Sequence, residues 1–217
     1  MFIKICGITN EDDALLCVAL GADAVGFVFA PSPRQVAAQR VFDISRRLPP
    51  EILTVGVFRD EVPARVAEIV RAAGIKGAQL HGHETPEITR AVKEQVRFVI
   101  QAFPAGSAAL DRAAEHDADV ILVDSPSPGS GQLFDWTLVD QAPTATRLLL
   151  AGGLTPDNVA AAITTVKPWG VDVSSGVERA PGRKDPVKLK DFVDAARAAA
   201  PTPYRGPDLM PYDWADE

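Results

Sequence analysis

The stretch AVGFVFAPSPRQVAAQRVFDISRRLPPEILTVGVF, residues 24–58, decides the fold class. It begins with a short apolar run at 24–29 and ends with a second one at 53–58. Between them, residues 35–48 repeat apolar side chains at helical spacing. A strand, a helix and a second strand in this order form a βαβ unit, whose two strands run parallel.

The same alternation continues in both directions along the chain, with one helical segment after each of eight predicted strands. No Gly-x-Gly-x-x-Gly follows the first strand, so the pattern favours a single closed (β/α)8 TIM barrel of eight parallel strands over an open doubly wound sheet. The predicted strands are 2–6, 24–29, 53–58, 77–80, 98–103, 120–124, 147–151 and 170–174, and the predicted helices are 11–20, 35–48, 63–73, 86–94, 108–116, 134–141, 156–166 and 187–199.

The composition of this 217-residue chain, 47% hydrophobic and 24% charged, is that of an ordinary globular protein and excludes disorder, collagen and coiled coil. We expect one catalytic barrel domain over residues 1–200. Residues 201–217 hold four prolines, an excess of acidic residues and no apolar period. They are predicted to form a Pro-rich acidic C-terminal tail, whose role the sequence leaves open.

The formal charge of −7 argues against nucleic acid or an anionic membrane as a partner. No apolar run approaches the roughly 20 residues of a membrane span, and residues 1–7 lack the layout of a signal peptide. We therefore expect a cytoplasmic protein. Cys6 and Cys17 share no ligand spacing with histidine, so neither a disulfide framework nor a zinc site is predicted.

In a barrel of this type the carboxyl ends of the strands and the loops after them build the active site. In the first strand, period two places Lys4 and Cys6 toward the interior and Ile3 and Ile5 toward the helices. Cys6 lies at the open end. Its position alone allows two interpretations, a catalytic thiol or a small buried hydrophobic residue.

Two carboxylates share this inward direction. Asp124 ends an apolar inward row at the rim, where desolvation raises the pKa of a carboxyl group and allows it to carry a proton at neutral pH. A helix cap or a salt-bridge partner is the alternative for Asp124. Asp172, on the last strand, is a candidate substrate ligand or a structural partner of Lys4.

Small residues follow the last two strands, at Gly152 and Gly153 and at Ser174, Ser175 and Gly176. Such turns let backbone N–H groups approach an anion closely, and the loops after strands seven and eight of these barrels commonly hold phosphate. The sequence therefore predicts a phosphate site that needs no basic surface.

Arg34 lies on a proline-stiffened loop after the second strand, where it can grip a carboxylate through two parallel hydrogen bonds or simply face solvent. His81 and His83, with Glu84 beside them, suggest a metal site, but no further ligand stands at a recognisable spacing. We predict no metal.

Several motifs occur together in this chain: KICGIT (4–9), GADAVGFVF (21–29) with SPR (32–34), QLHG (79–82), FDW (134–136), AGGL (151–154), and VDVSSGVE (171–178) with PGRKD (181–185). On these motifs the chain resembles phosphoribosylanthranilate isomerase of tryptophan biosynthesis over nearly all of residues 2–200. One departure is PGSG at 128–131, where that family commonly has Gly-Gly-Thr-Gly before Phe-Asp-Trp.

The resemblance implies an Amadori rearrangement of N-(5-phospho-β-D-ribosyl)anthranilate to 1-(2-carboxyphenylamino)-1-deoxy-D-ribulose 5-phosphate, with no cofactor. Asp124 would protonate the ribose ring oxygen, and Cys6, as a thiolate, would remove the C2 proton. Because Lys4 shares the inward face with Cys6, our hypothesis is that its positive charge favours the thiolate. Arg34 would hold the anthranilate carboxylate. The partner is then a phosphorylated aminosugar, and the sequence leaves monomer and homodimer both open.

Three alternative functions differ from this one in residues that can be checked in the sequence. A barrel isomerase acting on a histidine-pathway aminoaldose, or on both substrates, would use a carboxylate in place of Cys6. An indole-closing synthase would need a catalytic lysine and a longer N-terminal segment than one residue before the first strand. A non-catalytic phosphosugar-binding protein would have been favoured by loss of Cys6 or Asp124, and both are present.

Overall fold

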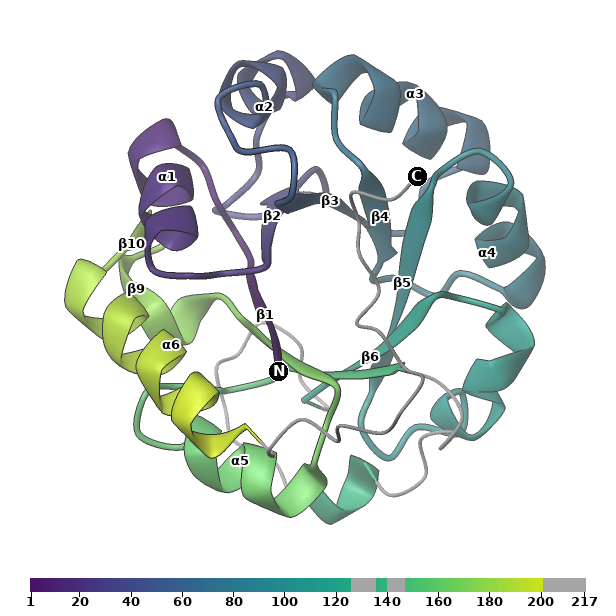
Figure 1. Ribbon diagram of the computed structural model, residues 1–217. Helices are drawn as coiled ribbons and strands as arrows, with labels where there is room; N and C mark the ends of the chain where they lie inside the picture. The colour runs from purple at the N-terminus through teal and green to yellow at the C-terminus, as the bar shows by residue number, and fades with distance from the viewer. Residues whose placement is uncertain (126–135, 140–146, 201–217) are drawn as a thin grey trace, which may run out of the picture.

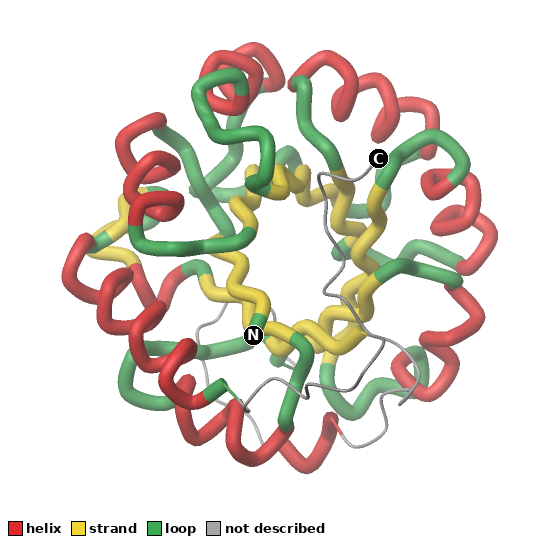
Figure 2. Tube along the Cα trace, viewed as in Figure 1, coloured by secondary structure: helices red, strands yellow, loops and turns green. Residues whose placement is uncertain are grey.

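Eight parallel strands close into a barrel in their order along the chain, in a computed structural model that describes residues 1–125, 136–139 and 147–200. The first strand pairs with the second and with the eighth, which closes the ring. Figures 1 and 2 show the strands as an inner ring surrounded by helices. This confirms the predicted (β/α)8 barrel. The strands are β1 (Phe2–Ile5), β2 (Ala24–Val28), β3 (Leu53–Phe58), β4 (Gly77–Leu80), β5 (Phe98–Pro104), β6 (Val120–Asp124), β7 (Arg147–Leu150) and β8 (Gly170–Val173).

Six α-helices of the described residues pack around this ring. Two of them begin at a proline that follows a capping residue: the Thr85 side chain accepts a hydrogen bond from the Ile88 N–H, and that of Asp185 accepts from the backbone two and three residues on. None of the helices in the described ranges combines the length and hydropathy that a membrane span requires. The helices are α1 (Glu11–Ala19), α2 (Ala38–Ser45), α3 (Pro63–Ala73), α4 (Pro86–Lys93), α5 (Val159–Val166) and α6 (Pro186–Ala199).

One predicted helix is wrong in type, and a second is described only in part. The segment after β5 is a 3₁₀ helix, η1 (Leu110–His116), whose buried residues Leu110, Ala113 and His116 recur every three positions, the period of a 3₁₀ helix. After β6, only the 3₁₀ helix η2 (Trp136–Val139) is described. The rest of the helix predicted at 134–141, the PGSG turn at 128–131 and the tail at 201–217 lie outside the described residues.

Other helix boundaries also differ, including the end of the helix predicted at 35–48, which lies at Ser45. The helices predicted to begin at 35 and 156 begin three residues later. The sequence analysis did not predict the two-stranded hairpin of β9 (Glu178–Ala180) and β10 (Arg183–Lys184), which follows the short 3₁₀ helix η3 (Ser175–Val177).

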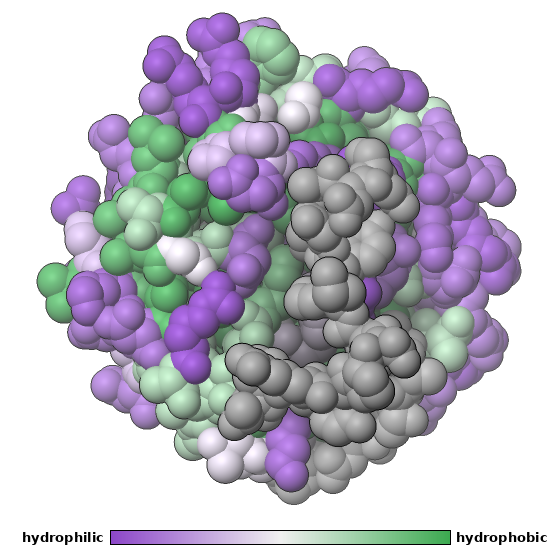
Figure 3. Space-filling view, viewed as in Figure 1, coloured by the Kyte–Doolittle hydropathy of each residue, from purple (hydrophilic) through white to green (hydrophobic). Residues whose placement is uncertain are grey.

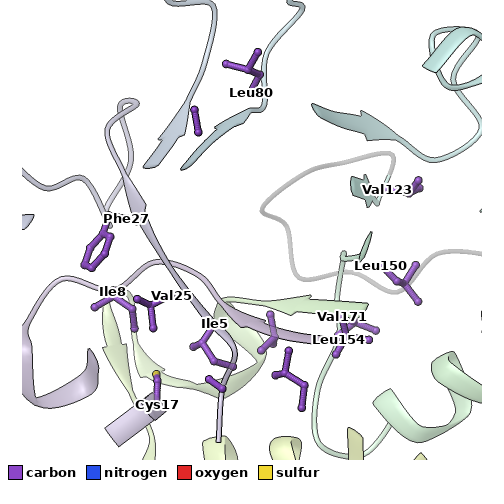
Figure 4. Close-up of a cluster of buried hydrophobic side chains, with 14 of the residues drawn as sticks. Ile5, Ile8, Cys17, Val25, Phe27, Leu80, Val123, Leu150, Leu154 and Val171 are labelled. Carbon is purple, nitrogen blue, oxygen red and sulfur yellow. The ribbon is translucent and has the colours of Figure 1, made fainter. Parts of the chain in front are cut away.

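The core has two layers, as period two in the strands predicts. Ile3 and Ile5 belong to the larger layer between strands and helices, whereas Phe2 packs inside the barrel. Figure 4 shows Ile5 and Val25 in the outer layer close to Cys17, which is fully buried there. Burying each such aliphatic side chain stabilises the fold by roughly 1.5–3 kcal/mol. Cys17 is thus a core residue.

The last helix is tied to the first βα unit. Arg197 of α6 donates through Nη2 to the Gly21 carbonyl at 2.7 Å and to Asp23 Oδ2 at 2.8 Å. Asp23 Oδ2 also accepts from the backbone N–H of Ile3 at 2.7 Å.

In the space-filling view the outer rim over α3 and α4 is hydrophilic (Figure 3).

Candidate active site

A cavity of about 260 Å³ opens at the carboxyl ends of the strands. All nine predicted site residues line it, because the carboxyl ends of parallel barrel strands meet at one rim. Gln79 and His81 also line it, as do Phe58 and Arg59 from the end of β3. The nine are Cys6, Arg34, Asp124, Gly152, Gly153, Asp172, Ser174, Ser175 and Gly176.

Cys6, which lines the cavity, lies beside a buried ion pair. Lys4 and Asp172 are direct neighbours across β1 and β8, and Lys4 Nζ donates to Asp172 Oδ1 at 2.8 Å. Lys4 is 0% exposed. Gly26 of β2 leaves room for both inward side chains, since a Cβ there would lie 2.8 Å from Cys6 Sγ and 3.2 Å from Lys4 Nζ. The structural partnership of Asp172 with Lys4, one of the two interpretations, is therefore present.

The charges around Cys6 oppose one another. Burial raises the pKa of the thiol, and the Asp172 carboxylate raises it further. The Lys4 and Lys184 ammonium groups lower the pKa of Cys6, but the net shift is upward. Burial lowers the pKa of Lys4, whereas Asp172 and Cys6 raise it and prevail, so Lys4 is held as a cation. The two lysines are therefore the groups that favour a thiolate.

Asp124 lies in a short chain of hydrogen bonds. Its Oδ1 accepts from the Ser125 N–H at 2.7 Å, and its Oδ2 lies 3.2 Å from His81 Nε2. Gln79 Nε2 donates to His81 Nδ1 at 2.8 Å, which leaves the ring proton on Nε2, facing Asp124. The sequence analysis missed this role of His81. The alternation of side chains along a strand places Gln79 and His81 on the same face, and this spacing could have indicated that His81 points into the cavity.

Arg34 is fixed by a carboxylate that the sequence analysis did not assign. Its Nε and Nη2 donate to Glu178 Oε1 and Oε2 at 2.9 Å and 2.7 Å, a bidentate pair that leaves Nη1 unused by Glu178. The side chain crosses over Gly7, whose φ is +78°, and a Cβ there would lie 2.6 Å from Arg34 Cδ. Arg34 therefore reaches the cavity as an oriented side chain.

The turns after β7 and β8 pack closely on their neighbours. Gly152 has a φ of +86°, and a Cβ there would collide with the backbone nitrogen of Ser125. A Cβ at Gly176 would collide with the Leu154 carbonyl oxygen. Only glycine allows the backbone to pack this closely at these two positions, and both glycines line the cavity.

His81 and His83, which follow β4, do not form a metal centre with Glu84. Glu84 is buried and accepts from the backbone N–H groups of Asp60 and Gly82, each at 2.8 Å. His83 is exposed beside Asp60. Over residues 1–125, 136–139 and 147–200, no three histidine, cysteine or acidic side chains gather as metal ligands.

Comparison with known proteins shows the family of the chain. The family model for N-(5'phosphoribosyl)anthranilate (PRA) isomerase matches residues 3–195. The N-(5'-phosphoribosyl)anthranilate isomerase of Desulforudis audaxviator is 48% identical over 204 residues, 91% of this chain and 98% of that one.

Solved structures agree with this assignment. The phosphoribosyl anthranilate isomerase of Thermus thermophilus is 39% identical, with a TM-score of 0.86 over 91% of this chain and 99% of that one. A phosphoribosyl anthranilate isomerase in complex with reduced 1-(o-carboxyphenylamino)-1-deoxyribulose 5-phosphate is 40% identical, with a TM-score of 0.81 and the same coverage. The chain belongs to the N-(5'-phosphoribosyl)anthranilate isomerase family.

Proposed function

We propose that Cys6 and Asp124 transfer the protons in the reaction of this isomerase, and that Arg34, Asp172 and the turns after β7 and β8 hold its substrate. The reaction is the Amadori rearrangement of N-(5-phospho-β-D-ribosyl)anthranilate to 1-(2-carboxyphenylamino)-1-deoxy-D-ribulose 5-phosphate in tryptophan biosynthesis. The observation that carries the assignment of roles is that all these residues line one cavity.

The first step opens the ribose ring. Asp124, in its protonated form, donates to the ring oxygen, and the bond from C1 to that oxygen breaks as the anthranilate nitrogen lone pair forms a protonated Schiff base. The carboxylate left on Asp124 accepts from His81 Nε2–H and from the Ser125 N–H. These two donors stabilise the charge that the step creates.

The second step moves hydrogen at C2. The Cys6 thiolate removes the C2 proton, and the released electron pair forms the C1–C2 double bond while the Schiff-base nitrogen becomes neutral. The resulting enolamine tautomerises to the ketone, so substrate and product are isomers. The substrate's own nitrogen is the electron sink, and Lys4 supplies positive charge beside the thiolate.

The ends of the substrate carry the charges that fix it. Arg34, oriented by Glu178, binds the anthranilate carboxylate through its remaining N–H groups. Backbone N–H groups around Gly153 and Gly176, with the hydroxyls of Ser174 and Ser175, bind the phosphate. The solved family member in complex with a reduced carboxyphenylamino-deoxyribulose phosphate supports a phosphorylated aminosugar as the ligand.

The test follows anthranilate fluorescence after freshly made phosphoribosylanthranilate is mixed with the protein in the presence of EDTA. Cys6→Ala and Asp124→Asn should each lower kcat by about 10² to 10⁴, the usual contribution of a general acid or base. Cys17→Ala, which changes the other thiol in the helical layer, is the matched control and should keep wild-type kcat. A Cys6→Ala protein within tenfold of wild type would require a different base.

We further infer a cytoplasmic location and a monomer or homodimer. Both cysteines are free and buried, which suits a reducing compartment. Light scattering coupled to size-exclusion chromatography gives the assembly state, and a mass of three or more chains would contradict the inference.

A further inference from the structure

Lys184 is a buried lysine outside the set of proposed catalytic and binding residues. It is 1% exposed, and its ammonium donates to three acceptors: the Cys6 carbonyl at 2.6 Å, the Ser174 carbonyl at 3.0 Å and Glu178 Oε1 at 3.2 Å. An ammonium has three N–H donors, so all of them are used.

These three acceptors belong to three separate parts of the site. The Cys6 carbonyl ends the strand that carries the thiol, and the Ser174 carbonyl starts the turn after β8 that lines the phosphate side of the cavity. Glu178 holds the guanidinium of Arg34 through both carboxylate oxygens. One ammonium therefore joins the base, the anion-binding turn and the carboxylate-binding arginine.

The hairpin that carries Lys184 is itself fixed to the first βα unit. The backbone N–H of Lys184 donates to Asp13 Oδ2 of α1 at 2.9 Å, and Thr9 Oγ1 donates to the Gly182 carbonyl at 2.6 Å. Figure 1 shows β9 and β10 beside α1 and α6. The backbone of the hairpin is thus fixed against the first βα unit, and the Lys184 side chain extends from it to the Cys6 carbonyl.

The charges around Cys6 explain why a cation stands here. Lys4 on β1, Lys184 on β10 and Arg34 after β2 face two carboxylates, Asp172 on β8 and Glu178 on β9. A thiolate on Cys6 would be a further anion facing these three cations, besides Asp13 Oδ2, which accepts from the Lys184 backbone N–H. Lys184 also lowers the pKa of Cys6.

We propose that Lys184 is a positioning residue of the isomerase, which holds Cys6, the turn at Ser174 and the Glu178–Arg34 pair in their working arrangement. This inference rests on the proposed roles of Cys6 and Arg34. Lys184 touches no reacting atom. It acts through the groups that its ammonium binds.

The experiment compares Lys184→Met with Lys190→Met, an exposed lysine of α6 paired only with Asp194 among the described residues. Steady-state kinetics at 25 °C give kcat and KM. Iodoacetamide labelling of Cys6, followed by peptide mass spectrometry across pH, gives the midpoint of thiolate formation, and thermal melting gives stability. We expect Lys184→Met to lower kcat and raise KM at least tenfold each and to move the labelling midpoint to higher pH, with Lys190→Met within twofold of wild type.

Glu178→Gln is the second variant. It keeps the Lys184 ammonium and removes the carboxylate charge that pairs with both Arg34 and Lys184. It should raise KM as Arg34→Met does and leave the labelling midpoint of Cys6 unchanged. If Lys184→Met does not fold, an unchanged KM in Glu178→Gln overturns the proposal. A lower melting temperature of Lys184→Met with wild-type kcat, KM and labelling would show a merely structural role and overturn it too.

The two levels of inference fail differently. If Cys6→Ala and Arg34→Met keep wild-type kinetics, the proposed function is at fault. If those two lose activity while Lys184→Met and Glu178→Gln behave like Lys190→Met, only the role of Lys184 is wrong.

Discussion

Replacing Lys4 with methionine removes the cation nearest to the proposed base while keeping an unbranched buried side chain. A Cβ placed on Gly26 would lie 2.8 Å from Cys6 Sγ and 3.2 Å from Lys4 Nζ. The sulfur and the nitrogen are therefore at most about 6 Å apart. At that distance and an effective dielectric constant near 20, an ammonium stabilises a thiolate by about 3 kcal/mol. The variant should therefore lose roughly 100-fold in kcat/KM at pH 7 and recover part of the loss as the pH rises.

The assay is the acidic limb of the pH profile of kcat/KM, measured beside iodoacetamide labelling of Cys6. Both should move to higher pH in Lys4→Met, because the ammonium that lowers the pKa of Cys6 is gone while Asp172 still raises it. Melting temperatures separate this effect from loss of fold, since Asp172 loses its buried partner. An acidic limb that coincides with that of wild type would refute a role for Lys4 in forming the thiolate.

Three further outcomes are expected. Asp172→Asn should move Cys6 labelling to lower pH, because the Asp172 carboxylate raises the pKa of that thiol; a shift to higher pH would contradict this. Arg34→Met should raise KM roughly 10- to 100-fold, the worth of one lost charge-assisted contact, and change kcat less, as steady-state kinetics would show. Burial raises the pKa of Cys17 from 9.0 to about 12. The buried neutral thiol therefore contributes fully to the free energy of unfolding below pH 9, and this contribution is lost as the pH rises toward 12, because the thiol ionises first in the unfolded chain. At pH 10 urea unfolding should show about 1.4 kcal/mol of additional loss in wild type relative to Cys17→Ala, with pH 8 as the reference.

Much of the barrel was predictable because its strands are short apolar runs with sharp ends. All eight predicted strands occur within one residue of their expected bounds. The segment after β5 was mistaken for an α-helix because its residues have good helix propensity. Its buried positions, Leu110, Ala113 and His116, recur every three residues, so packing rather than propensity determines the 3₁₀ form.

The residues that line the cavity were predictable from the two-residue alternation of side chains along each strand and from the positions of the strand ends. The side chains with which they form hydrogen bonds and ion pairs were not predictable in this way. Arg34 and Glu178 are 144 residues apart, and Lys184 reaches the Cys6 carbonyl over 178. Such pairs depend on how a hairpin packs at the rim, which local periodicity does not encode. His81 was grouped with His83 because they are neighbours in sequence, although its contact is Asp124 on β6.

The closure of β1 on β8 has a consequence for synthesis. Lys4 and Asp172 are separated by 168 residues, and at 5–20 residues per second the ribosome needs roughly 10–30 s to make that length of chain. Throughout that interval the first strand offers an unsatisfied edge of N–H and C=O groups. A nascent polypeptide must therefore keep that edge from adding to a neighbouring molecule until its own last strand emerges.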